Sequence, residues 1–458
     1  MRERPPHRTA ALLSVGDELT LGQTLDTNTK WLADRLWSAG VTTVEHATVD
    51  DDESRIARAL DRLGTEADLL IVTGGLGPTA DDLTRFALAR VIGGGADADR
   101  VTIEEDPGAL ATLRAWFADR PGGMPEANRV QATRPDGAEL LANANGTAPG
   151  LFARVERLGC DVWCLPGPPR EMHPMFDDHV APKIRREDGV VGGVRLLLTI
   201  GIGESAIAER LGDLLDRGRP ARGLPLVGTT ASGGVVTCRV RHEAADSETL
   251  VTALDAVEAD IGERLRPAVF ARRDPAKGDS LDIGGALAGA LIRMLTERGE
   301  MIAFAESCTC GLLGATLTAV PGSSASVFGG FQTYANEAKA ALLDIDMSRI
   351  DRFGAVSAEV ASSMAKAMLS RAREADSRVA HAVSITGVAG PGASEAKPAG
   401  TVFIGLASRD ADVEVRRFAF RGGREAVRSR STVAAMAMLR LRLIDESMPL
   451  LGEVSGET

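Results

Sequence analysis

The sequence predicts an α/β protein built from three domains. Its 458 residues are more than one hydrophobic core usually serves, and 44% of them are hydrophobic, so the chain is able to bury sizeable cores. Short apolar runs alternate with stretches of helical periodicity, which is the pattern of strands covered by helices. We expect a three-layer α/β domain over residues 1–170, a small middle α/β domain over 171–272, a linker over 273–282 and a C-terminal α/β domain over 283–458.

In the first domain, strands and helices alternate in the order of βαβ units, which predicts a parallel sheet with helices on its faces. Ligands of such sheets bind at the carboxyl ends of the strands. Glycine-containing turns follow three of the apolar runs, at Gly16, at Gly74 and at Gly167, so we expect all three at that edge. The predicted strands are 11–15, 41–49, 68–73 and 162–165, and the predicted helices are 27–39 and 55–64.

The middle and C-terminal domains show the same mixture of patterns. The polar, proline-containing stretch 271–280 is typical of a linker between them. A glycine-rich loop over 387–400 interrupts the last part of the chain. The predicted strands are 194–200, 235–240, 301–305, 327–334, 380–385, 401–407 and 413–420, and the predicted helices are 204–215, 247–261, 283–298, one from about 309, 337–343, 357–375 and 423–443.

Composition narrows the class of protein. No apolar run approaches the ~20 residues that cross a bilayer, so we expect no membrane partner. The net charge is −12 and the sequence has no basic cluster with interleaved aromatics, which argues against nucleic acid as a partner. Five cysteines without metal-ligand spacing fit a reducing compartment, so we expect a cytoplasmic protein.

The stretch from Thr73 to Thr84 combines a glycine turn with adjacent acids. Gly74, Gly75 and Gly77 would expose backbone N–H groups to a phosphate. Asp81 and Asp82, with Glu18 from the first turn, would hold a divalent metal that bridges phosphate oxygens. The alternative is that the two aspartates only cap a helix.

A second cluster of polar residues begins where the strand 301–305 turns into a helix. There the Ser307 and Thr309 hydroxyls and the first helical amides should face the same space, which suits an anion or an oxyanion. Helix capping by itself would explain one of these hydroxyls. It would not explain Ser324 in a second glycine-serine turn, or a loop that contains Gly387, Gly390 and Gly392.

Lys339 is notable because only six of the 52 basic residues are lysines. Arginine does not lose its proton near neutral pH, whereas a desolvated lysine is able to, so a lysine suits base-driven serine chemistry. We expect Ser324 and Lys339 side by side. The alternative is that Lys339 is a solvated helix residue and that Tyr334, the only tyrosine, is an ordinary core aromatic. Arg421 is a candidate phosphate anchor, and His381 is expected to be a core histidine.

These strings resemble the CinA (competence/damage-inducible) family. Residues 10–170 resemble its molybdopterin-binding-like domain, and residues 283–445 resemble its C-terminal nicotinamide-nucleotide amidase domain. The motifs that carry the resemblance are Gly16–Leu19, Thr73–Asp82, Leu165–Met172, Ala305–Gly311, Pro321–Lys339 and Gly387–Val402. One position departs from the family pattern, because Cys310 stands where the family usually has glycine.

The resemblance implies that the C-terminal domain hydrolyses nicotinamide mononucleotide (NMN) to nicotinic acid mononucleotide and ammonia without a cofactor. It implies Ser324 as nucleophile, Lys339 as base, Ser307 and Tyr334 as assisting hydroxyls and Arg421 as the residue that steers the nucleotide. Ser307 is the second choice of nucleophile.

For the first domain the resemblance implies metal-dependent hydrolysis of ADP-ribose at its pyrophosphate, with a metal of unknown identity. The expected partners are these nucleotides and a second copy of the chain in a homodimer. The alternative is a non-catalytic protein that binds a nucleotide or molybdopterin.

Overall fold

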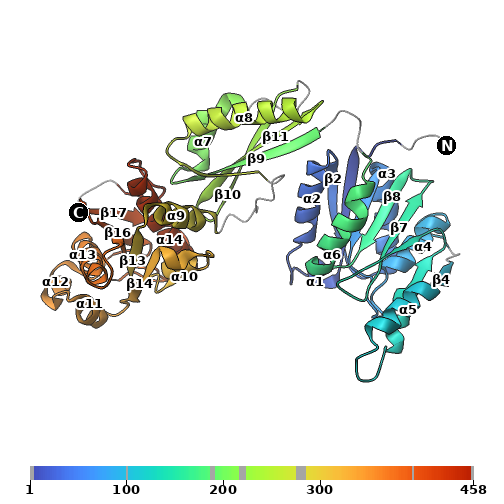
Figure 1. Ribbon diagram of the computed structural model, residues 1–458, viewed down its shortest axis with the longest axis horizontal. Coiled ribbons are helices and arrows are strands. Elements are labelled where there is room, and N and C mark those ends of the chain that lie inside the picture. The colour runs from blue at the N-terminus through green and yellow to red at the C-terminus, as the bar shows by residue number, and fades with distance from the viewer. Residues whose placement is uncertain are drawn as a thin grey trace. The chain divides into compact units, whose positions relative to one another are not determined.

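The computed structural model describes residues 5–98, 102–185, 191–215, 223–274, 285–394 and 397–454. They form two compact units, one made from residues up to 193 together with 242–252, the other from 194–241 and from 253 onward (Figure 1). Most of the predicted linker, 273–282, lies outside the described residues.

A six-stranded sheet in the order β2-β1-β3-β8-β7-β6 forms the centre of the first unit. Strands β2, β1, β3 and β8 are parallel, and β7 and β6 continue the sheet in antiparallel fashion. The bounds are β1 Thr9–Val15, β2 Thr42–Val49, β3 Leu69–Thr73, β6 Glu139–Leu141, β7 Gly150–Val155 and β8 Cys160–Leu165, with a separate pair of β4 Ile103–Glu105 and β5 Thr133–Pro135.

Helices cover both faces of this sheet and make three layers. Successive residues of a strand face opposite sides, so Leu13 packs with Leu60 of α3 and Leu88 of α4, whereas Leu12 packs with Leu36 of α2 and Met172 of α6. The helices are α1 Asp17–Thr20, α2 Asn28–Ser38, α3 Glu53–Glu66, α4 Thr84–Gly93, α5 Pro107–Trp116 and α6 Pro169–Met175, with short helical turns at Glu126–Ala132, Phe176–Val180 and Ala181–Lys183.

The predicted boundary at residue 170 lies inside α6. Met175, Phe176 and Val180 are buried against the first sheet together with Trp163, so the segment that follows residue 170 belongs to the first unit. No sequence signal marks the end of the first unit at residue 170, because the chain continues directly from the turn after β8 into α6.

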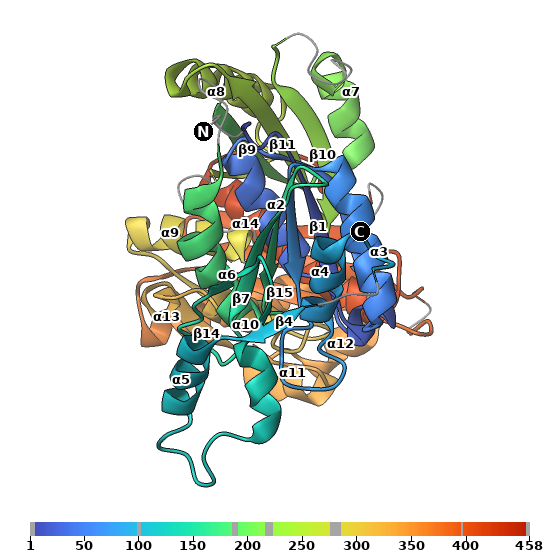
Figure 2. The ribbon, with the colours of Figure 1, turned by 90° about the vertical axis from the view of Figure 1, so that its right-hand side faces the viewer.

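The middle domain is a four-stranded sheet in the order β10-β11-β9-β12, with helices α7 and α8 (Figure 2). It packs against the C-terminal domain, since Ala286, the first residue of α9 (Ala286–Arg298), is buried with Leu196, Leu198 and Val235. The bounds are β9 Val191–Ile200, α7 Glu204–Leu215, β10 Leu226–Ser232, β11 Val235–Ala244, α8 Ser247–Arg264 and β12 Val269–Arg273.

The C-terminal domain is a five-stranded sheet in the order β14-β13-β15-β16-β17, parallel through β15 and antiparallel beyond it. Helices α9, α10 and α14 cover one face, and α11, α12 and α13 cover the other. The bounds are α9 Ala286–Arg298, β13 Met301–Glu306, α10 Leu312–Thr318, β14 Val327–Gln332, α11 Asn336–Leu343, α12 Met347–Phe353, α13 Ala358–Ala375, β15 Val379–Gly387, β16 Thr401–Ser408, β17 Ala411–Ala419 and α14 Arg424–Leu443.

One smaller expectation, for His381, is met in these elements. His381 lies buried in β15, with its ring nitrogens bonded to Ser408 and Glu300, so it is a core histidine. None of the described helices has the length and apolar content that crossing a bilayer requires.

Candidate active site

Lys339 is a buried lysine on the first turn of α11, with 1% of its surface exposed. Its Nζ donates to the Ser307 hydroxyl at 3.2 Å and to the carbonyl oxygens of Thr333 at 3.0 Å and Tyr334 at 3.3 Å. The alternative of a solvated lysine is therefore wrong. Because burial disfavours the charged form of an amine, Lys339 occupies the kind of environment in which a lysine serves as a base.

Ser307 follows the last residue of β13 and is 7% exposed. Its backbone N–H donates to the Ile385 carbonyl of the neighbouring strand β15 at 2.8 Å, which fixes the residue at the carboxyl edge of the sheet. Lys339 follows the carboxyl end of β14, the strand on the other side of β13. The parallel pairing of β13 and β14 thus brings the Ser307 hydroxyl and the lysine amine together.

Ser324 does not share this edge. It lies on a short turn, Ser323–Ala325, before the amino end of β14, whereas Lys339 comes after the carboxyl end of that strand. A strand of six residues such as β14 spans roughly 20 Å. The expectation that Ser324 and Lys339 lie side by side is wrong, because β14 holds them at opposite edges of the sheet.

The first amides of α10 are occupied by a residue of the protein itself. The fully buried Glu306 carboxylate accepts from the N–H groups of Gly311 at 3.0 Å, Leu313 at 3.1 Å and Gly314 at 2.9 Å. We expected these amides to bind an anion or an oxyanion, and that expectation is wrong. The glutamate satisfies the helix terminus and at the same time holds the turn that carries Ser307.

Two buried threonines, which lie close in the chain to Ser307 and Lys339, are candidates for contacts with a substrate. The Thr309 and Thr333 side chains are fully buried, and their Oγ1 atoms have no hydrogen-bond partner among the described residues. Thr333 also supplies a carbonyl to Lys339, and Thr309 lies two residues after Ser307. Buried hydroxyls in folded proteins normally have a partner, so these two suit a bound water or a polar group of a ligand.

Two arginines of α14 reach this site, and sequence reasoning missed both. Arg424 donates to the Tyr334 hydroxyl at 2.9 Å and to the Gly390 carbonyl at 3.1 Å, and Arg428 donates to the Thr309 carbonyl at 2.7 Å. Their spacing of four residues places them on one face of the helix, a signal that the sequence contained. Tyr334 itself is 56% exposed, so it is not a core aromatic.

Arg421, the predicted phosphate anchor, has a different setting. It is exposed, it precedes α14, and its carbonyl accepts a hydrogen bond from Arg430. It lines a separate cavity together with Gly201 and Leu450. Within the described contacts it is Arg424, three residues later, that meets Tyr334.

The three predicted loop positions differ in how strongly they require glycine. A side chain at Gly387 would meet the Val402 side chain at 2.7 Å and the Thr401 carbonyl at 2.9 Å, so close packing demands glycine. Gly390 has a φ of 93°, which favours glycine, and its carbonyl contacts Arg424. Gly392 is exposed and has open space around it.

The cysteines beside Ser307 have distinct environments. Burial raises the pKa of the Cys308 thiol to about 11, so it is not a thiolate nucleophile near neutral pH. Cys310 is exposed and has a φ of 46°, in the left-handed region that favours glycine. This backbone conformation explains why a glycine is suited to the position that Cys310 occupies.

In the first unit, the three glycine-containing turns converge as expected on one cavity of about 360 Å³. A side chain at Gly74 would strike the Val15 carbonyl at 2.3 Å, and one at Gly75 would strike the Thr84 hydroxyl at 2.3 Å. The lining includes Gly16, Glu18, Asp51, Gly74, Gly75, Gly77, Asp81, Asp82, Gly167 and Glu171.

The three predicted metal ligands, Asp82, Glu18 and Asp81, differ in their surroundings. Asp82 accepts from the backbone N–H groups of Gly77 at 2.7 Å and Thr79 at 2.8 Å, so it braces the loop. Across the described parts of the chain, no group of three or more His, Cys, Asp or Glu side chains is arranged to hold a metal ion. Glu18 and Asp81 are both exposed. Burial raises the pKa of Asp51, and the nearby carboxylates of Asp17, Glu18 and Asp81 raise it further.

Comparisons with known proteins give matches over all three domains. Residues 11–186 match the family model described as "Probable molybdopterin binding domain". Residues 194–271 match "Damage-inducible protein CinA KH domain", and residues 285–443 match "CinA C-terminal domain".

Full-length relatives and solved structures carry the same family names. A "CinA-like protein" of Geobacter metallireducens is 42% identical over 438 residues, which cover 95% of this chain and 99% of the relative. A "Putative competence-damage inducible protein" of Caldicellulosiruptor bescii is 38% identical over 437 residues, with the same coverage. The crystal structure of competence/damage inducible protein CihA from Agrobacterium tumefaciens is 38% identical, with a TM-score of 0.33, and covers 36% of this chain and 99% of its own. The two full-length relatives show that this chain belongs to the CinA (competence/damage-inducible) family.

Proposed function

We propose that the C-terminal domain hydrolyses the carboxamide of NMN to nicotinic acid mononucleotide and ammonia. The observation that carries this proposal is the hydrogen bond of 3.2 Å between the buried Lys339 amine and the Ser307 hydroxyl. An unactivated amide needs a nucleophile together with a base that later protonates the departing ammonia. A serine bonded to a buried lysine supplies both groups.

Ser307 is the proposed nucleophile. The neutral Lys339 amine takes the proton from the Ser307 hydroxyl as its oxygen bonds to the carboxamide carbon. The resulting ammonium then gives that proton to the nitrogen, the carbon–nitrogen bond breaks, and ammonia leaves an acyl-enzyme ester. Lys339 next takes a proton from water as the water oxygen bonds to the ester carbon. It then gives this proton to the Ser307 oxygen as the ester bond breaks, which releases the carboxylate and restores the serine hydroxyl.

The oxyanion that forms in both steps needs hydrogen-bond donors. The α10 amides are bonded to Glu306 and do not supply them. The Thr309 and Thr333 hydroxyls are buried and have no described partner, so we assign them to the carboxamide and its oxyanion. Arg424, bonded to the exposed Tyr334, is assigned to the nucleotide phosphate, since a guanidinium matches phosphate oxygens.

The test compares two serine variants of the full chain. Ammonia release from NMN should fall at least ~10²-fold in Ser307→Ala and less than about threefold in Ser324→Ala, because only Ser307 contacts the base. Mass spectrometry of enzyme quenched during turnover should place the acyl group on Ser307. An acyl group on Ser324, or a large loss in Ser324→Ala only, would contradict the assignment. Tight NMN binding without any ammonia release would instead favour the non-catalytic alternative.

For the first unit we propose that the cavity binds ADP-ribose and hydrolyses its pyrophosphate. The supporting observation is the convergence of glycine-rich backbone and carboxylates on one cavity. Asp51, with its raised pKa, is the carboxylate best suited to exchange a proton there. Asp51→Asn should abolish AMP release from ADP-ribose and leave NMN deamidation unchanged. Equal AMP release by wild type and variant would exclude Asp51 from the reaction.

A further inference from the structure

A cavity of about 500 Å³ lies between the middle domain and the C-terminal domain, within the second unit. The middle domain lines it with the turn that follows β9 and with the hairpin between β10 and β11. The C-terminal domain lines it with the end of β17, with α14 and with residues 450–452. Its volume lies in the range of small-molecule sites, which is ~300–1,000 Å³.

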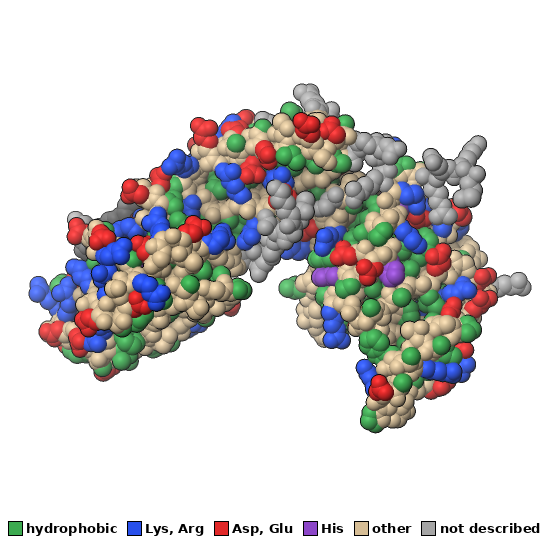
Figure 3. Space-filling view, in the orientation of Figure 1, with side chains coloured by type: hydrophobic (Ala, Val, Ile, Leu, Met, Phe, Trp, Pro, Cys, Tyr) green, Lys and Arg blue, Asp and Glu red, His purple; other side chains and the backbone are tan. Residues whose placement is uncertain are grey.

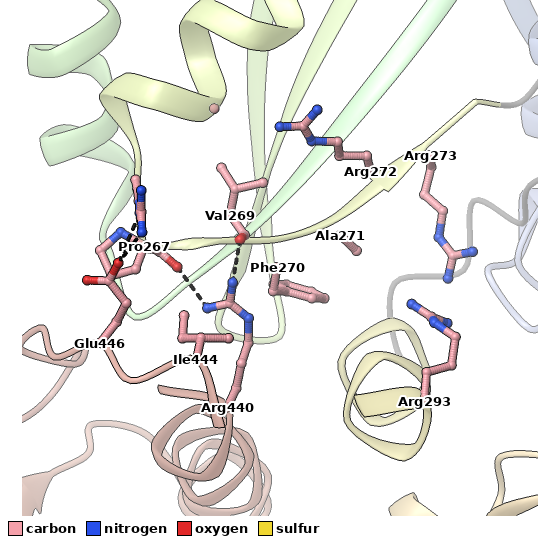
Figure 4. A pocket seen from close by; sticks show the side chains of 12 residues that line it. Pro267, Val269, Phe270, Ala271, Arg272, Arg273, Arg293, Arg440, Ile444 and Glu446 are labelled. Carbon is pink, nitrogen blue, oxygen red and sulfur yellow. Dashed lines mark hydrogen bonds and ion pairs between the residues drawn. The ribbon is translucent and has the colours of Figure 1, made fainter. Parts of the chain in front are cut away.

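The two domains that form the walls of this cavity are joined by direct contacts. Figure 4 shows Arg440 of α14 donating to the carbonyl oxygens of Pro267 at 2.7 Å and Val269 at 2.6 Å, which belong to the middle domain. At the cavity itself, a side chain at Gly201 would meet the Leu450 side chain at 2.5 Å, so the two walls touch there. The protein's own contacts therefore hold the walls at a fixed separation.

The inner wall of the cavity is apolar. Ile200, Phe420 and Leu450 line it, and each is at most 6% exposed because it also belongs to the core of the C-terminal domain. Burying hydrocarbon is favourable by about 25 cal/mol per Å², so this wall suits the apolar part of a ligand. The apolar residues that α14 adds to the lining are Val433, Ala434 and Ala437.

Among the described residues that line the cavity, three are charged, and two of these are arginines. The third, Glu204, accepts a hydrogen bond from the Thr229 hydroxyl at 2.9 Å. Arg430 donates to the Arg421 carbonyl, which brings its guanidinium beside the backbone of Arg421. On the face shown in Figure 3 basic side chains are intermixed with acidic ones, but neither of these arginines forms an ion pair within the described parts of the chain.

We propose that this cavity binds an apolar carboxylate, with the carboxylate group at Arg421 and Arg430 and the hydrocarbon part against the inner wall. A guanidinium group matches the two oxygens of a carboxylate. Both arginines are exposed, so the anionic group stays partly in water, which lowers the cost of binding a charge. A phosphate monoester would bring up to about two charges to a cavity with mainly apolar walls, so it suits the cavity less well.

Helix α14 contributes to this cavity and to the amidase site through different faces. Arg430, Val433 and Ala437 are spaced by three and four residues, which places them on one face of the helix. Arg428, which donates to Thr309 at the amidase site, precedes Arg430 by two residues and therefore points about 200° away around the helix. The proposed site is distinct from the amidase site, and the proposal does not depend on the amidase function.

The test is calorimetric titration of the full chain with octanoate, without NMN. Octanol, which has the chain without the charge, should bind more weakly, and acetate, which has the charge without the chain, should not bind. Arg421→Ala and Arg430→Ala should each raise the Kd for octanoate about fivefold or more, because each removes a charge-assisted hydrogen bond. In the double variant, octanoate should bind no more tightly than octanol.

A matched control is Arg349→Ala, which removes an exposed arginine of α12 that does not line the cavity and should leave the Kd unchanged. Equal weakening in this control would show diffuse attraction and overturn the proposal. Equal affinity of the wild type for octanoate and octanol, or no saturable binding of octanoate, would overturn it as well.

The position of the hydrocarbon part has its own test. Val433→Trp places a large side chain in the cavity and should abolish binding of both octanoate and octanol. Circular dichroism should establish that this variant is folded. Wild-type affinity for octanoate in a folded Val433→Trp protein would place the ligand elsewhere and contradict the proposal. The exposed arginine variants decide the matter if Val433→Trp does not fold.

Discussion

At the scale of single residues, the proposed chemistry depends on Lys339 being able to give up and accept a proton. Lys339→Arg keeps the positive charge and much of the volume but removes that ability, so kcat for NMN should fall ~10²-fold or more. Affinity for NMN, measured by calorimetry, should stay within a few-fold of wild type.

The pH dependence of kcat provides the control for this variant. A lysine base works in its neutral form, so wild-type kcat should rise with pH as the ammonium loses its proton, and the residual activity of Lys339→Arg should lack that rise. Turnover by the arginine variant near the wild-type rate would remove Lys339 from the mechanism.

Cys310 gives a second prediction at this scale, for stability. A residue other than glycine in the left-handed region destabilises the folded state by ~1–2 kcal/mol. Replacing it with glycine removes this strain, but lowers the free energy of unfolding by ~0.4–1 kcal/mol because glycine makes the unfolded chain more flexible. Cys310→Gly should therefore raise the free energy of unfolding by about 0.5 kcal/mol, measured by urea unfolding. Cys310→Ala, which keeps a Cβ, should show no gain. A destabilised glycine variant would mean that the thiol makes a compensating contact.

At the scale of elements, the site depends on features that the sequence shows only in part. The expected strand before Lys339 is present, and its existence is what separates Ser324 from the lysine. Two residues fifteen positions apart are neighbours if the chain between them turns back. They lie at opposite edges of the sheet if that chain runs as a single strand. Residue types do not reveal that difference. The same ambiguity applies to Glu306. A carboxylate at the end of a strand binds a ligand in some proteins and caps a helix of its own chain in others, and the residue type does not distinguish the two roles.

Asp161 of β8 links several segments of the first unit. Burial by itself would raise the pKa of this carboxyl, but hydrogen bonds from His7, Arg185 and Arg154 outweigh burial and hold the pKa well below its ordinary value. A carboxyl with a lowered folded-state pKa adds stability above the unfolded-state value of ~3.9, and that stability is lost as the pH falls toward the folded-state value.

Asp161→Asn should therefore destabilise the first unit at pH 7 by about 3 kcal/mol, because it leaves the charges of Arg154 and Arg185 without their partner. Urea unfolding should show this difference shrinking as the pH falls below ~4, where Asp161 takes up a proton in the unfolded wild-type chain while it stays ionised in the folded one. A difference that stays constant over that range would mean that packing, and not the ionised carboxylate, stabilises the segment.

At the scale of the whole molecule, the alternation of strands and helices predicted the α/β class and the three glycine turns at one edge of the first sheet. It did not predict how the middle domain packs. Ala286 and Phe270 bury apolar surface between the middle sheet and α9, a contact between segments that no periodicity connects.

This packing sets the expected behaviour of a fragment that begins at residue 285. The proposed site residues all lie within the C-terminal domain, so the fragment should release ammonia from NMN with a kcat within a few-fold of the full chain. They are Ser307, Thr309, Tyr334, Lys339 and Arg424. Removing the middle domain exposes the face of α9 that contains Ala286, and burial is worth ~25 cal/mol per Å² of apolar surface, so the fragment should melt at a lower temperature. Circular dichroism should first establish that the fragment is folded. A folded but inactive fragment would mean that a residue outside the C-terminal domain takes part in catalysis. In that case, the same fragment with Lys339→Arg would show no further loss of activity relative to the unsubstituted fragment.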